Sequence, residues 1–205
     1  MLPQQFEPLA QQMLQYLNSI YPFPAGLQED IVAILQHKSL RKRQHLLKDG
    51  EICRNIYFVA KGALRLYYYT DDGRQVTTWF MREKDVCVSV DSFYGQVKSY
   101  EYIRAEEDCE VFFITYDQLE GLYQKYLEFN FIGRVLTIKY LLDLFRQLKD
   151  IRLLGTEQRY NALLKRDPEL IQRFAKKFIA SFLSMLPTSL SRTLDPKKKK
   201  KNKKK

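Results

Sequence analysis

The segment from Lys176 to Asp195 carries the residues best suited to contact a nucleic acid. Its sequence, KKFIASFLSMLPTSLSRTLD, predicts a helix, a tight turn and a second helix with Pro187 at its start. The second helix would present hydroxyls and one guanidinium, which can reach phosphates or base edges in a DNA major groove. Its outward residues are Thr188, Ser189, Ser191 and Arg192. From the pattern alone, an ordinary helical hairpin with an apolar seam fits equally well.

Other chemistries have little support in the sequence. There are two histidines, His37 and His45, and three cysteines that lie far apart, which fits neither a metal site nor a paired disulfide framework. The cysteines are Cys53, Cys87 and Cys109. The sequence also lacks a nucleophile–base pair and a phosphate-cradling glycine loop. We therefore expect no catalytic residue, no metal and no cofactor, and we expect both histidines at the surface.

Charge and hydropathy indicate a folded, cytoplasmic protein. The 205-residue chain has a formal net charge of +10, but residues 197–205 contain eight lysines, so the remainder carries 10 − 8 = +2. A lysine block of this kind repels itself and is expected to be disordered. Hydrophobic residues make up 45% of the chain, which is enough to build a core. Apolar runs fall short of the roughly 20 residues that span a bilayer, so we expect no membrane contact.

The residues before this segment predict helices, then strands, then helices again. Apolar residues at helical spacing cover residues 5–20 and 25–37. From about residue 40 to residue 115, short apolar and β-branched runs alternate with turn residues, which predicts a sandwich, barrel or jelly roll. Residues 71–73, Asp-Asp-Gly, predict a hairpin turn because they tolerate positive φ. Helical spacing returns over residues 116–125.

A long helix over residues 129–153 is apolar on two sides. One stripe consists of Val135, Ile138, Leu142 and Phe145. A second stripe consists of Leu141, Leu144, Leu148 and Ile151. Two apolar stripes need two partners, the chain's own β-domain and the same helix of a second subunit, so we predict a homodimer through the first stripe. The alternative is a helix buried in a larger monomer. Gly155 would end this helix, and Thr156 would cap the next one.

The order of these parts resembles the Crp/Fnr superfamily of transcription regulators. The stretch GEICRNIYFVAKGALRLYYYTDDGRQVTTWF is similar to the opening strands of the family's sensor domain, and FIASFLSMLPTSLSR is similar to the recognition motif of a Bacteroidetes-like branch. The resemblance covers about residues 25–195. It implies an α+β fold with an N-terminal double-stranded β-helix (a jelly-roll, cyclic-nucleotide-binding-like sensor domain), a long dimerisation helix and a C-terminal helix-turn-helix. The parts would be the sensor domain with its N-terminal helices at 1–128, the dimerisation helix at 129–153, the DNA-binding domain at 154–196 and the lysine tail at 197–205.

The resemblance further implies a dimer that binds a two-fold symmetric DNA site. Arg192 matches the family arginine that reads a base, and its planar fork suits guanine. Ser189 and Ser191 match positions that contact backbone phosphates. Lys176 and Lys177 lie at the start of the first motif helix and would also position the protein rather than specify sequence.

Two positions depart from the family motif. The turn usually carries glycine where this chain has Ser184, and the threonine that usually caps the second helix is replaced by Leu186, which cannot cap. These departures favour an alternative function, a dimeric ligand-binding or interaction module with a degenerate DNA-binding domain.

The resemblance also locates an effector site. In cyclic-AMP-binding relatives a Gly-Glu pair holds the ribose and an Arg-Ser pair clamps the cyclic phosphate. Counting back from Arg104 without a gap places Val88 and Ser89 at the first pair, and Ser99 and Tyr100 at the second. Serine carries no charge, so a buried phosphate would lose its cationic partner. The candidate pocket residues are Val88, Ser89, Lys98, Ser99, Tyr100 and Tyr102. We expect a small-molecule effector other than cyclic AMP, or a pocket closed by packing, with Tyr94, Tyr100 and Tyr102 filling the space.

Overall fold

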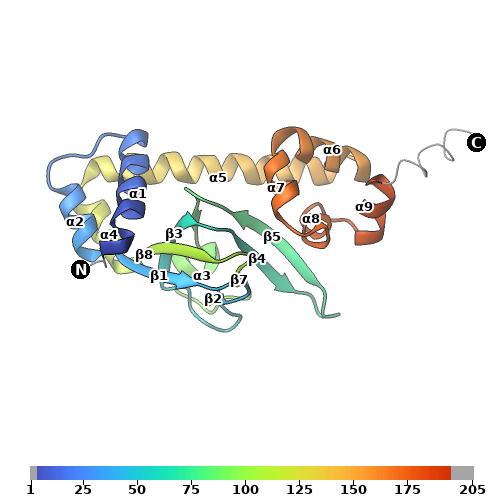
Figure 1. Ribbon diagram of the computed structural model, residues 1–205, viewed down its shortest axis with the longest axis horizontal. Helices are drawn as coiled ribbons and strands as arrows, with labels where there is room; N and C mark the ends of the chain where they lie inside the picture. The colour runs from blue at the N-terminus through green and yellow to red at the C-terminus, as the bar shows by residue number, and fades with distance from the viewer. Residues whose placement is uncertain (1–3, 195–205) are drawn as a thin grey trace, which may run out of the picture. The chain divides into compact units, whose positions relative to one another are not determined.

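The computed structural model describes residues 4–194 (Figure 1). The chain folds into two compact units. The first comprises the residues up to Tyr68 together with Phe80–Lys139, and the second comprises Tyr69–Trp79 and the residues from Tyr140 onward. One β-hairpin and one long helix therefore contribute to both units.

The first unit opens with helices and an edge strand. A 3₁₀ turn, η1 (Gln4–Phe6), leads into α1 (Glu7–Ile20), and α2 (Leu27–Ile34) follows. The two predicted helices are confirmed, but the second ends earlier than expected because β1 (Gln36–Leu40) begins there. Only Leu40 of β1 is buried. The strand therefore lacks the alternation of apolar and polar residues that marks a strand in the sequence.

Two four-stranded sheets form the β-domain. Sheet A has the order β1-β8-β3-β6, and sheet B has the order β2-β7-β4-β5. The further strands are β2 (His45–Leu47), β3 (Asn55–Lys61), β4 (Leu64–Tyr69), β5 (Gln75–Met81), β6 (Val86–Cys87), β7 (Tyr102–Ala105) and β8 (Cys109–Thr115). Val59 and Val111 pair across sheet A, Leu66 and Ile103 pair across sheet B, and all four are almost completely buried. Buried apolar residues on both sheets are typical of two sheets packed face to face, as the jelly-roll prediction requires.

The hairpin between β4 and β5 forms where the sequence predicts it. The Thr70 N–H donates to the Arg74 carbonyl at 2.9 Å, and Gly73 has a φ of +78°. A short helix, α3 (Val90–Gly95), was not predicted, because six residues are too few to show helical periodicity. The helix α4 (Tyr116–Lys125) has the predicted bounds and begins with a capping box between Thr115 and Gln118.

The helix α5 (Leu127–Leu153) starts two residues before the predicted position, and four short helices follow it. These are α6 (Thr156–Arg166), α7 (Pro168–Arg173), α8 (Lys176–Phe182) and α9 (Pro187–Leu194). The prediction that Thr156 caps α6 is wrong, because Gly155 holds the cap position and donates its N–H to the Gln158 side chain. The Asp167 side chain caps α7 by accepting the Leu170 N–H at 3.0 Å.

The prediction of surface histidines is also wrong. The Nε2 atom of His37 lies 2.7 Å from a carboxylate oxygen of Glu110, and its ring stacks on Phe6. The Nε2 atom of His45 lies 3.0 Å from the Tyr67 hydroxyl. Both rings are partly buried because cross-strand aromatic and carboxylate partners enclose them.

Candidate functional site

Three polar side chains converge where the sequence places the effector site. Ser89, Ser99 and Glu101 are almost completely buried. The Ser89 hydroxyl donates to a carboxylate oxygen of Glu101 at 2.9 Å and lies 3.1 Å from the Ser99 hydroxyl. The Glu101 N–H in turn donates to the Ser99 hydroxyl at 2.9 Å. We call these three residues the Ser–Glu cluster.

Backbone hydrogen bonds fix the two serines of the Ser–Glu cluster. Ser89 precedes α3, and its carbonyl accepts the Phe93 N–H at 2.8 Å. Its hydroxyl makes no capping bond to this helix and is instead bound to Glu101. The Ser99 N–H donates to the Glu51 carbonyl, and the Ser99 carbonyl accepts the Gly50 N–H, each at 2.8 Å. The cluster is therefore held by a turn on one side and a helix start on the other.

The structure brings only two of the six candidate pocket residues into this cluster. Ser89 and Ser99 meet, while Val88 is half-buried and Lys98 is exposed. Tyr100 is 56% exposed and donates to Asp91 at 3.3 Å. Tyr102 stacks on Tyr67, with 5.2 Å between the ring centroids.

The expected filling of the pocket by tyrosines is therefore wrong. Tyr94 and Tyr100 are about half exposed. Tyr102 pairs with Tyr67 on the face of sheet B opposite to the buried Ile103, because successive residues of a strand point to opposite faces. Glu101, which the sequence did not indicate, lies two residues after Ser99 and directly before β7.

The Ser–Glu cluster favours some ligands over others. Two hydroxyls can donate or accept hydrogen bonds, and an ionised carboxylate only accepts them. A phosphate placed beside Glu101 would meet a like charge in a buried site, where electrostatic repulsion is stronger than in water. A neutral or cationic group that donates hydrogen bonds would find acceptors there.

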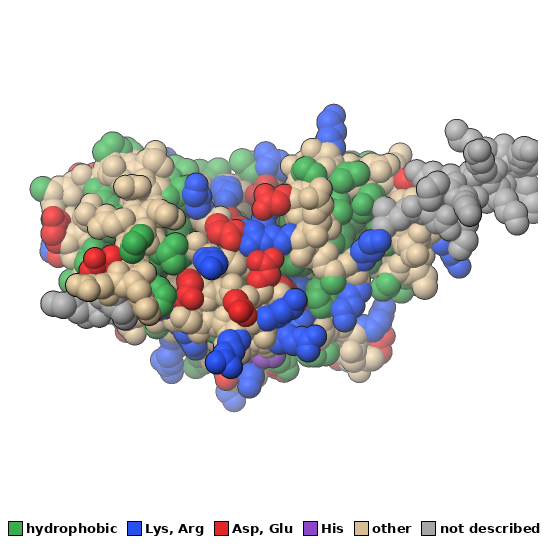
Figure 2. All heavy atoms as spheres, viewed as in Figure 1, with side chains coloured by type: hydrophobic (Ala, Val, Ile, Leu, Met, Phe, Trp, Pro, Cys, Tyr) green, Lys and Arg blue, Asp and Glu red, His purple; other side chains and the backbone are tan. Residues whose placement is uncertain are grey.

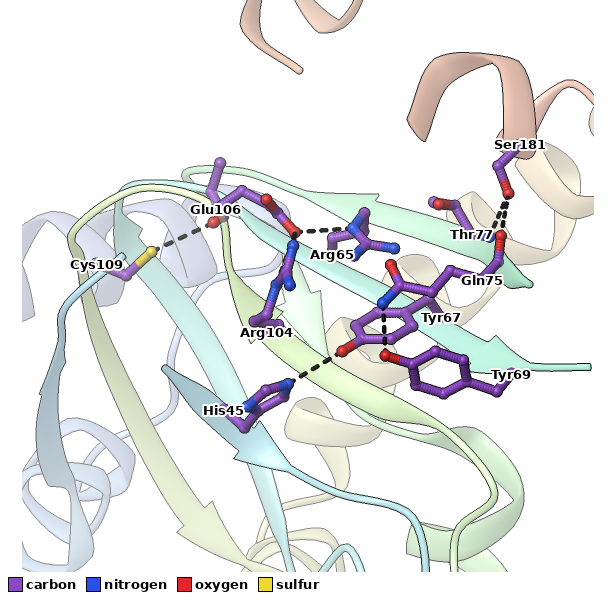
Figure 3. Close-up of polar contacts among 11 residues, drawn as sticks. His45, Arg65, Tyr67, Tyr69, Gln75, Thr77, Arg104, Glu106, Cys109 and Ser181 are labelled. Carbon is purple, nitrogen blue, oxygen red and sulfur yellow. Dashed lines mark hydrogen bonds and ion pairs between the residues drawn. The ribbon is translucent and has the colours of Figure 1, made fainter. Parts of the chain in front are cut away.

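A second buried network lies on β4 and β7. The fully buried Arg65 donates through Nε to Glu106 at 2.8 Å, and Arg104 donates to the same carboxylate oxygen at 2.7 Å (Figure 3). The Arg65 guanidinium also lies 4.0 Å above the Tyr67 ring. Burial lowers the pKa of Arg65, an effect that Glu106 opposes. Burial, and secondly the positive charge of Arg104, lower the pKa of His45. The sequence did not indicate this network, because its members alternate along the chain with buried apolar residues and therefore form no continuous polar motif.

The α8–turn–α9 segment has a defined turn geometry. Ser184 has a φ of +53°, in the left-handed region where the related motif carries glycine. The Met185 N–H donates to the Ala180 carbonyl at 2.9 Å, and the Ser184 N–H donates to the Ser181 carbonyl at 3.0 Å. This pair of bonds is a Schellman motif, which satisfies the last carbonyls of α8. Leu186 is exposed, and its aliphatic side chain cannot accept a hydrogen bond from α9.

Buried residues hold α8 and α9 together and leave one polar face exposed. Ile179 and Ala180 of α8 and Leu190 of α9 are at most 1% exposed. The exposed residues include Lys176, Lys177, Thr188, Ser191 and Arg192, while Ser189 is half-buried. The structure therefore places five of the six candidate DNA-contacting residues at the surface.

A side chain of α8 also binds the edge of β5. The Ser181 hydroxyl donates to the Gln75 carbonyl at 3.0 Å and accepts the Thr77 N–H at 2.9 Å (Figure 3). All three residues belong to the second unit. Because β5 is an edge strand, this serine satisfies backbone groups that a neighbouring strand would otherwise pair.

The helix α5 exposes both apolar stripes. Phe129 and Ile132 near its start are buried. Val135, Ile138, Leu142 and Phe145 of the first stripe are between 45% and 61% exposed. Leu141 and Leu144 of the second stripe are 47% and 48% exposed. Figure 2 shows hydrophobic side chains at the surface along the path of α5. An apolar surface of this kind is typical of an interaction site.

The comparison with family models identifies the β-domain. Residues 37–126 match the model of the cyclic nucleotide-binding domain. The Ser–Glu cluster, α3 and the Arg65 network all lie within the matched residues, and α5 begins directly after them.

Several solved structures share the fold over most of the chain. The c-di-GMP-responsive global regulator CLP of Xanthomonas campestris aligns with a TM-score of 0.69 at 20% identity, covering 88% of this chain and 93% of that one. A protein from Eubacterium rectale assigned to the Crp/Fnr family of transcriptional regulators aligns with a TM-score of 0.68 at 18% identity, covering 86% of each chain. The catabolite activator protein of Thermus thermophilus aligns with a TM-score of 0.52 at 17% identity, covering 87% of this chain and 84% of that one. These alignments, at 20% identity or less, show that the chain shares the fold of these proteins.

Three further results are negative. No curated protein matches the sequence. Among residues 4–194, no cluster of three or more His, Cys, Asp or Glu side chains could hold a metal ion. Within the same residues, no helix has the length and apolar character needed to cross a membrane.

Proposed function

We propose that this protein is a Crp/Fnr-type transcription regulator that binds DNA as a homodimer in the cytoplasm and has no enzymatic activity. The observation that carries the proposal is the exposed polar face of α8 and α9, held by a buried apolar seam. The fold shared with the regulators named above supports it. The functional parts are a sensor domain at 1–128, a dimerisation helix at 129–153 and a DNA-binding domain at 154–196. The lysine tail at 197–205 lies outside the described residues.

DNA recognition would rest on α9 in a major groove. Arg192 is exposed near the end of this helix, where its guanidinium can donate two hydrogen bonds to one guanine. Thr188 and Ser191 on the same exposed face can reach phosphates or neighbouring bases. Lys176 and Lys177 at the start of α8 would bind backbone phosphates, which adds affinity without sequence preference.

Dimerisation would pair the exposed apolar stripe of α5 with its copy in a second subunit. A two-fold axis along this helix places two copies of α9 symmetrically, which suits a two-fold symmetric DNA site. The stripe formed by Val135, Ile138, Leu142 and Phe145 supplies the seam. Removing these side chains from water provides the driving force.

The sensor domain would not bind cyclic AMP. Ser99 stands where related domains place the arginine that clamps the phosphate, and the buried carboxylate of Glu101 adjoins it. Isothermal titration with cyclic AMP and cyclic GMP is expected to give no heat of binding at micromolar concentrations. Micromolar binding that Lys98→Ala abolishes would contradict this part of the proposal, because it would mean that Lys98 replaces the missing arginine.

A second candidate function is a dimeric ligand-binding or interaction module that no longer reads DNA. Two observations favour it. Ser184 adopts a conformation that serine disfavours, and Leu186 leaves α9 without a side-chain cap. Both features weaken the segment that would enter the groove.

Selection of bound DNA separates the two candidates. The purified protein, with and without residues 197–205, is incubated with genomic fragments, and the bound fragments are sequenced. A regulator yields a recurring palindrome with both proteins, and removal of the tail weakens binding to all fragments and flattens the dependence on salt. A folded dimer that enriches no sequence would support the second candidate.

A further inference from the structure

The side chain of Arg159, on α6, joins the ends of two other helices. Its Nε atom donates to the Leu154 carbonyl at 2.9 Å, and one terminal nitrogen donates to the Ile151 carbonyl at 2.7 Å. The other terminal nitrogen donates to the carbonyls of Leu183 and Ser184, at 3.1 and 3.4 Å. The first two carbonyls lie at the C-terminal end of α5, and the last two lie in the turn between α8 and α9. All of these residues belong to the second unit.

The chemistry of arginine suits this position. A helix leaves its last carbonyls without partners inside the helix, and these carbonyls carry partial negative charge. A guanidinium is a cation whose N–H groups are fixed in one plane, so it can bond two helix ends at once. A lysine ammonium concentrates its donors at one point and would reach one of the two ends at a time. Arg159 is half-buried, which limits the competition of water for these bonds.

A second side chain supports the same connection. The Gln147 amide of α5 donates to the carbonyl of Phe182, the last residue of α8, at 3.4 Å. Arg159 and Gln147 together bond the three consecutive carbonyls of residues 182–184, whereas the Schellman motif uses the two carbonyls before them. The turn is therefore bonded to α5 directly through Gln147 and also through Arg159.

These bonds shorten the path between the helix that would form the dimer and the helix that would read DNA. Along the chain, α6, α7 and α8 separate α5 from α9. Small rotations at the links between these helices would add up, and the first link contains Gly155. A dimer that reads a two-fold site must hold its two recognition helices about 34 Å apart. A bond from the end of α5 to the turn before α9 fixes this placement independently of the links.

We propose that Arg159 is a positioning residue for DNA recognition, which fixes α9 relative to the end of α5 so that dimerisation sets the spacing of the two recognition helices. This role rests on the proposed function and deepens it, because it names the residue that connects the dimer helix to the DNA-reading helix. Arg166 offers a matched comparison. It also joins α6 to α5, through an ion pair with Asp150 at 3.1 Å, but this ion pair does not involve the turn.

Distances between two spin labels test the positioning without DNA. The labels are attached at Lys149→Cys on α5 and Ser191→Cys on α9, which are exposed positions, while the chain's own three cysteines are buried. The labelled full chain is diluted with an excess of unlabelled protein, so that pairs within one chain dominate. Arg159→Gln is expected to broaden and shift the distribution of distances, and Arg166→Gln to leave it unchanged. An unchanged distribution in Arg159→Gln would overturn the proposal.

DNA binding then separates positioning from charge. Arg159→Lys keeps the charge but reaches one helix end at a time, so the ratio of its affinities for the selected palindrome and a scrambled duplex should fall roughly tenfold. In Arg166→Gln the ratio should stay constant, because the lost charge acts on both duplexes alike. A wild-type ratio in Arg159→Lys would contradict the proposal, since charge alone would then suffice.

Two controls keep the outcomes distinct. The fluorescence of Trp79, in the same unit, shows whether each variant is folded. If Arg159→Gln does not fold, the label distances are measured in Arg159→Lys, where an unchanged distribution likewise overturns the proposal. A wild type that selects no palindrome would contradict the proposed function, and the label distances would still decide whether Arg159 positions α9.

Discussion

Replacing Ser184 with glycine should stabilise the protein, although it removes a side chain. Ser184 is the second residue after the end of α8, directly after the cap residue Leu183, and has a φ of +53° within a Schellman motif. Its side chain is exposed, so the substitution removes little packing. The two backbone hydrogen bonds of the motif do not involve the side chain and would remain.

The magnitude follows from two opposing contributions. A residue with a Cβ in the left-handed region costs about 1–2 kcal/mol relative to its right-handed conformation, a cost that glycine does not have. Glycine also gives the unfolded chain more freedom, which lowers the free energy of unfolding by about 0.4–1 kcal/mol. The balance is a stabilisation of roughly 0.5–1 kcal/mol. For a unit of this size that raises the midpoint of thermal unfolding by roughly 2–8 °C.

The single tryptophan provides the assay. Trp79 belongs to the same unit as Ser184 and lies edge-on to Tyr140, so its fluorescence reports the unfolding of that unit. Ser191→Gly is the matched control, because Ser191 is exposed on α9, where glycine costs about 0.5 kcal/mol more than serine. The two substitutions should therefore shift the urea midpoint in opposite directions. A loss of stability in Ser184→Gly equal to that in Ser191→Gly would refute the reasoning.

Three further predictions follow from the same contacts. Leu142→Glu combined with Phe145→Glu should convert a dimer into a monomer in light scattering, because charges replace apolar side chains of the first stripe. A wild-type protein that is monomeric at micromolar concentration would contradict the proposed dimer interface. The pKa of His45 is lowered by burial and by Arg104, so its contribution to stability is complete above about pH 6.5 and is lost as the pH falls. Between pH 7 and pH 5 the wild type should accordingly lose more stability in urea titrations than His45→Gln. An equal loss of stability in the two proteins would show that protonation of His45 is not the cause. Ser181→Ala should lower the free energy of unfolding seen by tryptophan fluorescence by about 1–3 kcal/mol, because two part-buried backbone groups of β5 lose this hydrogen-bond partner, and an unchanged midpoint would mean that water replaces the hydroxyl.

The sequence predicts the parts of the fold that carry a strong local pattern. The helix α4 and the β4–β5 hairpin lie at their predicted positions because a capping residue and turn residues mark them. The first two residues of β1 fall inside the predicted helix over residues 25–37, because the strand's sequence, QHKSL, contains a single buried apolar residue. The short α3 has no periodicity long enough to detect. The pattern of apolar residues in a sequence therefore identifies a helix or strand only where one face of that element is apolar.

The residues of the candidate sites also differ in how well the sequence predicts them. Counting along the related sequences places Ser89 and Ser99 at one site, and the structure brings their hydroxyls together. The burial of Glu101, just before β7, and of Arg65 on β4 depends on contacts between segments far apart in the sequence, which the sequence does not state. The unusual conformation of Ser184, in contrast, follows from a motif that normally has glycine there. A motif predicts a backbone conformation more reliably than it predicts the residues that pack around it.

Binding of Arg192→Ala to DNA tests the central claim most directly. Fluorescence anisotropy at one salt concentration compares the wild type and the variant on the selected palindrome and on a scrambled duplex. A bidentate contact to one base is worth about 1–3 kcal/mol, so the variant should bind the palindrome roughly 5- to 150-fold more weakly and the scrambled duplex with unchanged affinity. Lys177→Ala is the control for a phosphate contact and should weaken binding to both duplexes by the same factor. Equal loss on both duplexes for Arg192→Ala would contradict the claim that α9 reads a DNA sequence.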